Sequence, residues 1–186
     1  MDEPLFRSTH AALTFAYNFQ GAPALSIMNR MIKNPGDSDA PPPKGLAGLD
    51  GAAQAGMIRR HVASLGRFSE ALIIAEFAPR KFPCTCRSAC CIGHTPNQEW
   101  LDAVNNITDS VRTNALGSCH TTHKIGRVLV EVYFGVKVPG NKLAEILEVS
   151  ENTVSKMKGL VRKYLEVQQN NTRTRADDEL RVLIAE

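Results

Sequence analysis

The chain has 186 residues, of which 43% are hydrophobic, and a formal net charge of +3 at pH 7. This length allows one domain or two small ones with a real core, and so small a net charge excludes a polyelectrolyte. No apolar run approaches the roughly 20 residues that span a bilayer, and the start MDEPLFRSTH lacks the apolar core of a secretion signal, so a cytoplasmic protein with no membrane partner is expected.

Residues 1–80 predict a helical body. Ser8 or Thr9 can cap a first helix, and a second, methionine-rich helix is expected over 24–33. The stretch 34–50, NPGDSDAPPPKGLAGLD, is rich in proline and glycine and predicts a loop. Loops of this length are uncommon inside compact domains, so this one is expected to be a connector or a functional arm.

A long helical region is expected after this loop, with Asp50 as its cap and Ala78 near its end. Its apolar residues recur at helical spacing. Gly56 and Gly66 are weak points within it, because glycine is a poor helix former. Pro79 then ends the helix.

The segment 81–120 contains four cysteines within eight residues, in FPCTCRSACCIGH. They are Cys84, Cys86, Cys90 and Cys91. Zinc takes four soft or borderline ligands in a tetrahedron, so a closed structural Zn²⁺ site is predicted in a small knuckle. Because adjacent cysteines rarely bind one ion together, His94 is a candidate replacement ligand, and Cys119 and His123 are more remote candidates. Redox chemistry and ordinary buried thiols remain alternatives.

A further helix is expected after the cysteines, with Thr95 as its cap and Pro96 in its first turn. Trp100 is expected to anchor the core on its apolar face. Another helix should follow over about Thr122 to Phe134. No strand is predicted, so the expected fold class is all-α.

The stretch Lys142 to Lys163, KLAEILEVSENTVSKMKGLVRK, predicts two helices joined by a tight turn. Ser150 is a candidate N-cap of the second helix. Glu148 stands where a helix-turn-helix usually has a glycine with positive φ, which costs of order 1 kcal/mol. With the preceding helix, these elements form an expected three-helix unit over residues 121–169.

One face of the second helix in this unit is predicted to contact DNA. It is polar and free of acidic residues, and it offers amides and hydroxyls for base edges and lysines for phosphates. The candidate contacts are Asn152, Thr153, Ser155, Lys156, Lys158 and Lys163. Residues 120–175 carry ten Lys and Arg against five Asp and Glu, so the basic charge is concentrated here. An ordinary pair of packed helices with a solvated face, or a protein-binding module, would give a similar pattern.

Residues 170–186, NNTRTRADDELRVLIAE, are expected to form a flexible tail that ends in a short amphipathic helix. This helix is expected to dock on the body, on a second copy in a homo-oligomer, or on another protein.

No catalytic motif is found. The sequence lacks a phosphate-binding glycine loop, a nucleophile elbow and a His-Glu metalloprotease helix, and GAAQAG lacks the lysine that a phosphate loop needs. An enzyme is therefore not predicted, although a cysteine nucleophile paired with a nearby histidine is conceivable.

Taken together, the chain resembles the Q-type late-gene antitermination proteins of lambdoid bacteriophages and related prophages. The resemblance covers roughly Ala11 to Gln169 and lies in the order of GLDGAAQAGMIRRHV, EFAPRKF, the cysteine segment PCTCRSACC and a helical C-terminal part. The cysteine spacing differs from the paired spacing of the lambda-type member. Separately, Ile125 to Lys163 resembles the last helix-turn-helix of bacterial sigma factors, most closely in LAEILEVSENTVSKM.

This resemblance implies a function in transcription. Such a protein binds duplex DNA beside a late promoter, joins paused RNA polymerase that still holds sigma factor, and suppresses pausing and termination. It also implies that the cysteine knuckle is a structural metal site and that Asn152, Ser155, Lys156 and Lys163 lie at the DNA. A helix-turn-helix regulator of initiation and a zinc-stabilised interaction module are the alternatives.

Overall fold

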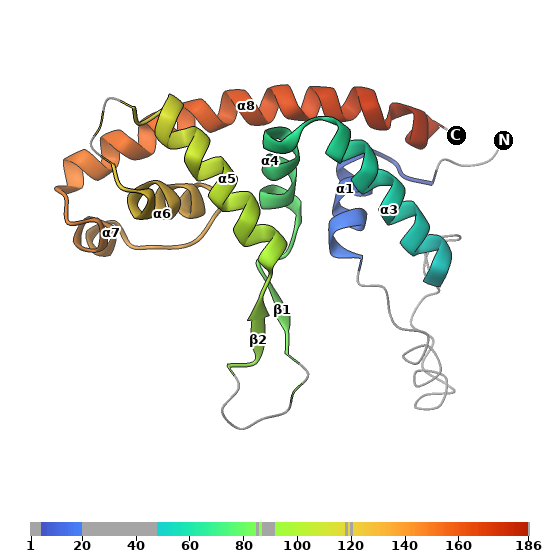
Figure 1. Cartoon of the computed structure of the whole chain (residues 1–186), viewed down its shortest axis with the longest axis horizontal. Coiled ribbons are helices and arrows are strands. Elements are labelled where there is room, and N and C mark those ends of the chain that lie inside the picture. The colour runs from blue at the N-terminus through green and yellow to red at the C-terminus, as the bar shows by residue number, and fades with distance from the viewer. Residues whose placement is uncertain are drawn as a thin grey trace. The chain divides into compact units, whose positions relative to one another are not determined.

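The structure is a computed structural model that describes residues 5–19, 48–84, 86, 92–117, 119 and 121–185 of the chain. The described elements are helices apart from one two-stranded antiparallel sheet (Figure 1). This confirms a mostly helical fold and corrects the expectation that no strand is present. None of the described helices combines the length and the apolar character that crossing a membrane requires.

The chain divides into two compact units. Unit 1 comprises Met1–Ser64 with Ala176–Glu186, and unit 2 comprises Leu65–Arg175. The longest helix, α8 (Glu151–Ala185), therefore contributes residues to both. This division differs from the expected boundaries near residues 80, 120 and 169, because the last helix belongs partly with the N-terminal elements.

In unit 1, α1 (Thr9–Asn18) packs against α3 (Gly48–Ser64). Ser8 caps α1 as predicted, since its Oγ accepts the N–H of Ala11 at 3.2 Å. Apolar side chains form the core. They include Phe6, Leu13, Ala16, Tyr17, Ile58, Val62, Ala176 and Leu180, all of which are buried.

The start of α3 corrects one prediction. The helix begins at Gly48, so Asp50 lies inside its first turn and is not the cap. A carboxylate there still suits the positive end of the helix dipole. The predicted helix over 24–33 and the loop up to residue 47 lie outside the described residues.

The long helical region predicted up to Ala78 is interrupted once. Gly66 has φ +97°, a conformation that side-chain-bearing residues rarely adopt, and it separates α3 from α4 (Arg67–Phe77). Gly56, the other predicted weak point, remains helical within α3. The helical run ends just before Pro79, as predicted.

Unit 2 is built around α5 (Gln98–Asn114), which packs against α4 on one side and against α6 (His123–Tyr133) on the other. Trp100 is buried, and its indole N–H donates to the carbonyl oxygen of Ala75 at 3.1 Å, which confirms its predicted place in the core. Val104, Ile107 and Val111 are completely buried along the same face of α5.

A short hairpin leads from α4 to α5. Its strands are β1 (Lys81–Pro83) and β2 (His94–Pro96), and Figure 1 shows them extending away from the ends of the two helices. Thr95 and Pro96 therefore lie in a strand. The cap of α5 is instead Asn97, whose Oδ1 accepts the N–H of Glu99 at 3.0 Å.

Asn97 also explains why a strand forms where a helix start was predicted. Its side chain is buried, and its Nδ2 donates to the carbonyl oxygen of Pro79 at 2.7 Å. Its backbone N–H donates to the carbonyl oxygen of Arg80 at 3.0 Å. One residue thus closes the base of the hairpin and starts α5, and this role depends on a tertiary contact that local sequence does not reveal.

The predicted flexible tail is also corrected, because α8 continues without a break to Ala185. In unit 2, Thr172 is buried with its Oγ1 3.4 Å from the Oγ of Ser69. Arg175 donates to the carbonyl oxygen of Leu65 at 2.8 Å and to Ser69 Oγ at 3.3 Å. The polar stretch after Gln169 is helical because its side chains bond to the start of α4.

Candidate nucleic-acid interface

The turn between α7 (Gly140–Leu147) and α8 has a defined backbone geometry. Glu148 has φ 54° and ψ 38°, which is the left-handed conformation predicted for this position. Its N–H donates to the carbonyl oxygen of Glu145 at 3.2 Å, and the N–H of Val149 donates to that of Ala144 at 3.1 Å. This pair of bonds is a Schellman motif, which satisfies the last carbonyls of α7 and turns the chain sharply.

Ser150 then starts α8, as predicted. Its Oγ accepts the N–H of Thr153 at 3.3 Å, so one of the unpaired donors of the first turn is satisfied. The same oxygen lies 2.8 Å from the hydroxyl oxygen of Thr153. The turn and the cap together fix the residue at which α8 begins and the rotation of α8 about its own axis.

The apolar face of α8 is buried as the helical pattern predicted. Val154, Met157, Val161 and Leu165 are each at most 4% exposed. Leu143 and Leu147 of α7 are buried too, so both helices contribute to the core. Tyr164, half-buried beside them, lies 2.9 Å from the hydroxyl of Ser110 on α5.

Most of the predicted DNA-contacting residues share the opposite, exposed face of α8. Asn152, Ser155, Lys156 and Lys163 are exposed, and a Cβ added to Gly159 between them would meet no atom within 4 Å. At 100° per residue, Lys156 and Lys163 lie only about 20° apart around the helix. Two acids border this face: the exposed Glu151 lies one turn before Ser155, and Glu166, whose carboxylate is bonded to Arg162 at 2.7 Å, ends the face one turn after Lys163.

Two predicted contacts are placed differently. Lys158 is exposed but lines a pocket on another side of α8, about 140° around the helix from Lys163. Thr153 is exposed, but its hydroxyl lies against the N-cap Ser150. The exposed face that the structure brings together is therefore smaller than the predicted one, and it consists of Asn152, Ser155, Lys156, Gly159 and Lys163.

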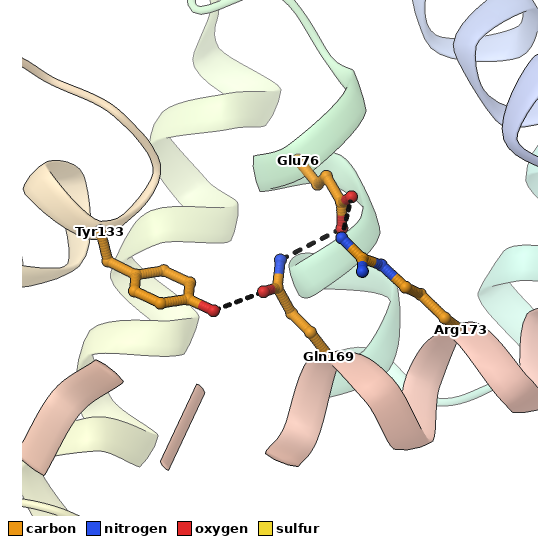
Figure 2. A network of polar contacts seen from close by, with 4 residues as sticks. All are labelled: Glu76, Tyr133, Gln169 and Arg173. Atoms are coloured by element: carbon orange, nitrogen blue, oxygen red, sulfur yellow. Dashed lines mark hydrogen bonds and ion pairs between the residues drawn. The ribbon is translucent and has the colours of Figure 1, made fainter. Parts of the chain in front are cut away.

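A polar network that the sequence did not predict joins α8 to α4 and α6 (Figure 2). The hydroxyl of Tyr133 donates to Gln169 Oε1 at 2.5 Å, and Gln169 Nε2 donates to Glu76 at 3.1 Å. Arg173 forms an ion pair with the same carboxylate at 2.5 Å. These contacts span up to 97 positions in the chain, so no local pattern could reveal them.

The electrostatics around this network are set by burial and by neighbouring carboxylates. Burial raises the pKa of Tyr133 above its usual value of 10.0, and the nearby Glu166 adds to the shift. The hydrogen bond from Arg162 to Glu166 raises the pKa of the guanidinium further. Both groups therefore keep their protons at neutral pH, and Tyr133 remains a hydrogen-bond donor.

The cysteine segment is described only in part. Cys84 is half-buried directly after β1, with its N–H donating to the carbonyl oxygen of Gly93 at 3.0 Å, and Cys86 is exposed. Cys90 and Cys91 lie outside the described residues. Within the described ranges, no three His, Cys, Asp or Glu residues are grouped so that they could hold a metal ion.

The alternative ligands are separated. His94 opens β2 and is paired in register with Pro83, at the same end of the sheet as Cys84. His123 instead belongs to α6, where its Nε2 lies 3.6 Å from Asp109 on α5. Cys119 is half-buried in the connection that precedes α6.

Comparisons with known proteins leave the family open. No protein-family model matches the chain, and a search of curated proteins finds none that is significantly similar in sequence.

Proposed function

We propose that α7, its turn and α8 form a helix-turn-helix that places the first turns of α8 in the major groove of duplex DNA. The observation that carries this proposal is the exposed, acid-free face of Asn152, Ser155, Lys156, Gly159 and Lys163. Amide and hydroxyl groups can read base edges, lysines can pair with phosphates, and a glycine lets the helix approach closely.

The rigid start of α8 supports this proposal. Recognition in the major groove requires that a helix present its side chains in one fixed rotation. The Schellman motif at Glu148 and the cap at Ser150 fix that rotation from one side, and the buried apolar face fixes it from the other.

The biological setting that we propose is transcription antitermination. It follows from the resemblance to Q-type late-gene proteins and to the last sigma-factor helix-turn-helix. In this setting, the protein binds DNA near a late promoter, joins bacterial RNA polymerase, with sigma factor still bound, and suppresses pausing and termination.

We also propose a structural Zn²⁺ at the end of the hairpin where β1 leads into the segment that connects it to β2. Cys84 and His94 meet at the end of the two strands, Cys86 follows two residues after Cys84, and thiolates with an imidazole suit zinc. The ion would be held by Cys84 and Cys86 together with Cys90 and Cys91, or with His94 in place of one cysteine. It would close the segment between β1 and β2 and perform no chemistry.

The DNA contact can be tested with three single substitutions. A binding site is first selected from a randomised duplex library, and affinities are then measured against salt. We expect Lys156→Ala to weaken binding to all sequences alike and to reduce the salt slope by about one, because one phosphate contact is lost. Asn152→Ala should remove about 1–3 kcal/mol of binding free energy that discriminates between bases at one base pair, and so relax the sequence preference there.

Lys158→Ala is the matched control. It removes the same charge from the same helix, but from the side that lines the pocket, so we expect a smaller effect on DNA affinity. Unchanged affinity and preference in both Lys156→Ala and Asn152→Ala would remove this face from the interface. A binding curve that does not depend on salt would favour a protein-interaction module instead.

The transcriptional setting has a separate test. With purified bacterial RNA polymerase, an antitermination factor increases read-through of a terminator placed downstream of the selected site. A regulator of initiation changes the number of transcripts and leaves the read-through fraction constant.

A further inference from the structure

A pocket of about 860 Å³ lies between α4, α6 and α8 within unit 2. Its apolar lining comes from Ala75, Leu129, Val132, Phe134 and Val161. Leu129 and Val161 are buried at its base, whereas Val132 and Phe134 are only half-buried. The volume falls in the range of ligand pockets and is large enough for a side chain with its neighbours.

The charges around the pocket are unbalanced. Both carboxylates that line the pocket already have partners. Glu76 pairs with Arg173, and Glu166 pairs with Arg162. Lys158 lines the pocket with no carboxylate partner among the described residues.

A further cation stands at one edge. Arg80 donates to the carbonyl oxygens of Phe134 and Gly135, so its charge is bonded to neutral acceptors and is not cancelled by a carboxylate. The lining itself holds three cations, Lys158, Arg162 and Arg173, against two carboxylates, and Arg80 beside it raises the local net charge from +1 to +2.

We propose that this pocket docks a segment of a partner protein in which a large apolar side chain is flanked by Asp or Glu. The apolar side chain would cover Leu129 and Val161, which removes apolar surface from water. The flanking carboxylates would pair with Lys158 on α8 and with Arg80 beside the end of α6, which gives complementary charge.

The two carboxylates that line the pocket favour a polypeptide over a nucleic acid. A phosphate chain that crosses the pocket would pass Glu76 and Glu166 and be repelled by them, even though each is paired. An acidic peptide instead carries single charges that can stay at the rim while only its apolar side chain enters.

The pocket and the proposed DNA face adjoin at Gly159, which belongs to both, but their lysines lie on different sides of α8. Lys158 points toward the pocket side and Lys163 toward the DNA side, about 140° away. The docking proposal therefore goes beyond the proposed function and does not depend on it, and the two can fail independently.

The probe is a short fluorescein-labelled peptide with one Phe between Glu residues, and its affinity for the full chain is measured by fluorescence anisotropy. Two matched peptides replace the Glu residues with Lys, or the Phe with Ser. We expect the Phe–Glu peptide to bind at least about tenfold more tightly than either of these, because both the charge and the apolar anchor contribute.

Charge reversals in the protein separate the two surfaces. Lys158→Glu should weaken the Phe–Glu peptide about tenfold, and Lys163→Glu should change its affinity by less than about twofold. For the selected DNA duplex, the order of the two effects should be reversed. Val132→Asp, checked for helicity by circular dichroism, places a charge on the pocket wall and should also weaken the peptide.

Several outcomes would overturn the docking proposal. They are failure of the Phe–Glu peptide to bind, equal binding of the Lys peptide, equal effects of Lys158→Glu and Lys163→Glu, and displacement of the peptide by single-stranded RNA. Loss of DNA binding in Lys163→Glu with peptide binding retained would support both surfaces. Retained DNA binding in that variant would count against the DNA face alone.

Discussion

Glu148 has a backbone conformation that most side chains avoid. A residue with a Cβ pays roughly 1 kcal/mol in the left-handed region, and glycine does not. The sequence located this residue because a helix-turn-helix requires a positive φ at a fixed distance from the second helix. Its hydrogen bonds could not be predicted to the same detail, although Ser150 as the next cap could.

We expect Glu148→Gly to raise the free energy of unfolding by about 0.5–1 kcal/mol, because the strain relieved exceeds the added freedom of the unfolded chain. Thermal unfolding followed by circular dichroism measures the effect. Glu145→Gly is the matched control, since it removes the same charge from a helical position and should destabilise by about as much. A lower melting temperature for Glu148→Gly would contradict the strain at this turn.

At the scale of elements, α8 shows which part of a helix a sequence pattern can reveal. Its first four turns have a regular apolar stripe from Val154 to Leu165, and these were predicted with their buried and exposed faces. Beyond Gln169, the stripe gives way to polar residues. That part is helical because Thr172, Arg173 and Arg175 bond to residues of unit 2 far away in the chain.

Tyr133 tests whether the network on α8 stabilises unit 2. We expect Tyr133→Phe to lower the free energy of unfolding by about 1 kcal/mol at neutral pH, because the hydroxyl no longer donates to Gln169. Denaturant titration measures the difference. Tyr164→Phe is the companion variant, since it removes a hydroxyl that contacts only Ser110 among the bonds described.

The pH dependence of this difference has a definite sign. The pKa of Tyr133 is raised in the folded protein, so the folded state holds the proton more tightly than the unfolded state does. Its contribution is complete below the unfolded value of 10.0 and is lost as the pH rises through the folded value. The difference in free energy of unfolding between the unmodified protein and Tyr133→Phe should therefore shrink above pH 10.0. A difference that grows would contradict the hydrogen bond from Tyr133.

At the scale of the whole molecule, composition and periodicity predicted a helical protein and most of its helix positions. They missed the hairpin, because β1 and β2 are only three residues each and are closed by the tertiary contacts of Asn97. They also missed the two-unit division, in which Ala176–Glu186 groups with the N-terminal elements. Both features depend on contacts between distant residues, which a local pattern does not encode.

Metal content tests the proposed zinc site in the intact protein. We expect freshly purified protein to contain zinc, and Cys86→Ser to lose it together with roughly 5 °C or more of melting temperature. Cys119→Ser is the comparison for a cysteine outside the cluster and should retain the metal. Protein that carries no zinc, or a Cys86→Ser variant that keeps both metal and stability, would contradict the site.

Trp100 gives this chain a built-in optical reporter. It is the single tryptophan in the sequence, it is 4% exposed, and the guanidinium of Arg80 lies 5.7 Å from its ring centre. The same guanidinium bonds to the carbonyl oxygens of Phe134 and Gly135 at the pocket edge. Selectively excited tryptophan fluorescence of the unlabelled protein therefore follows the melting of unit 2 alone, and a shift in its emission registers any guest that pulls Arg80 from the indole.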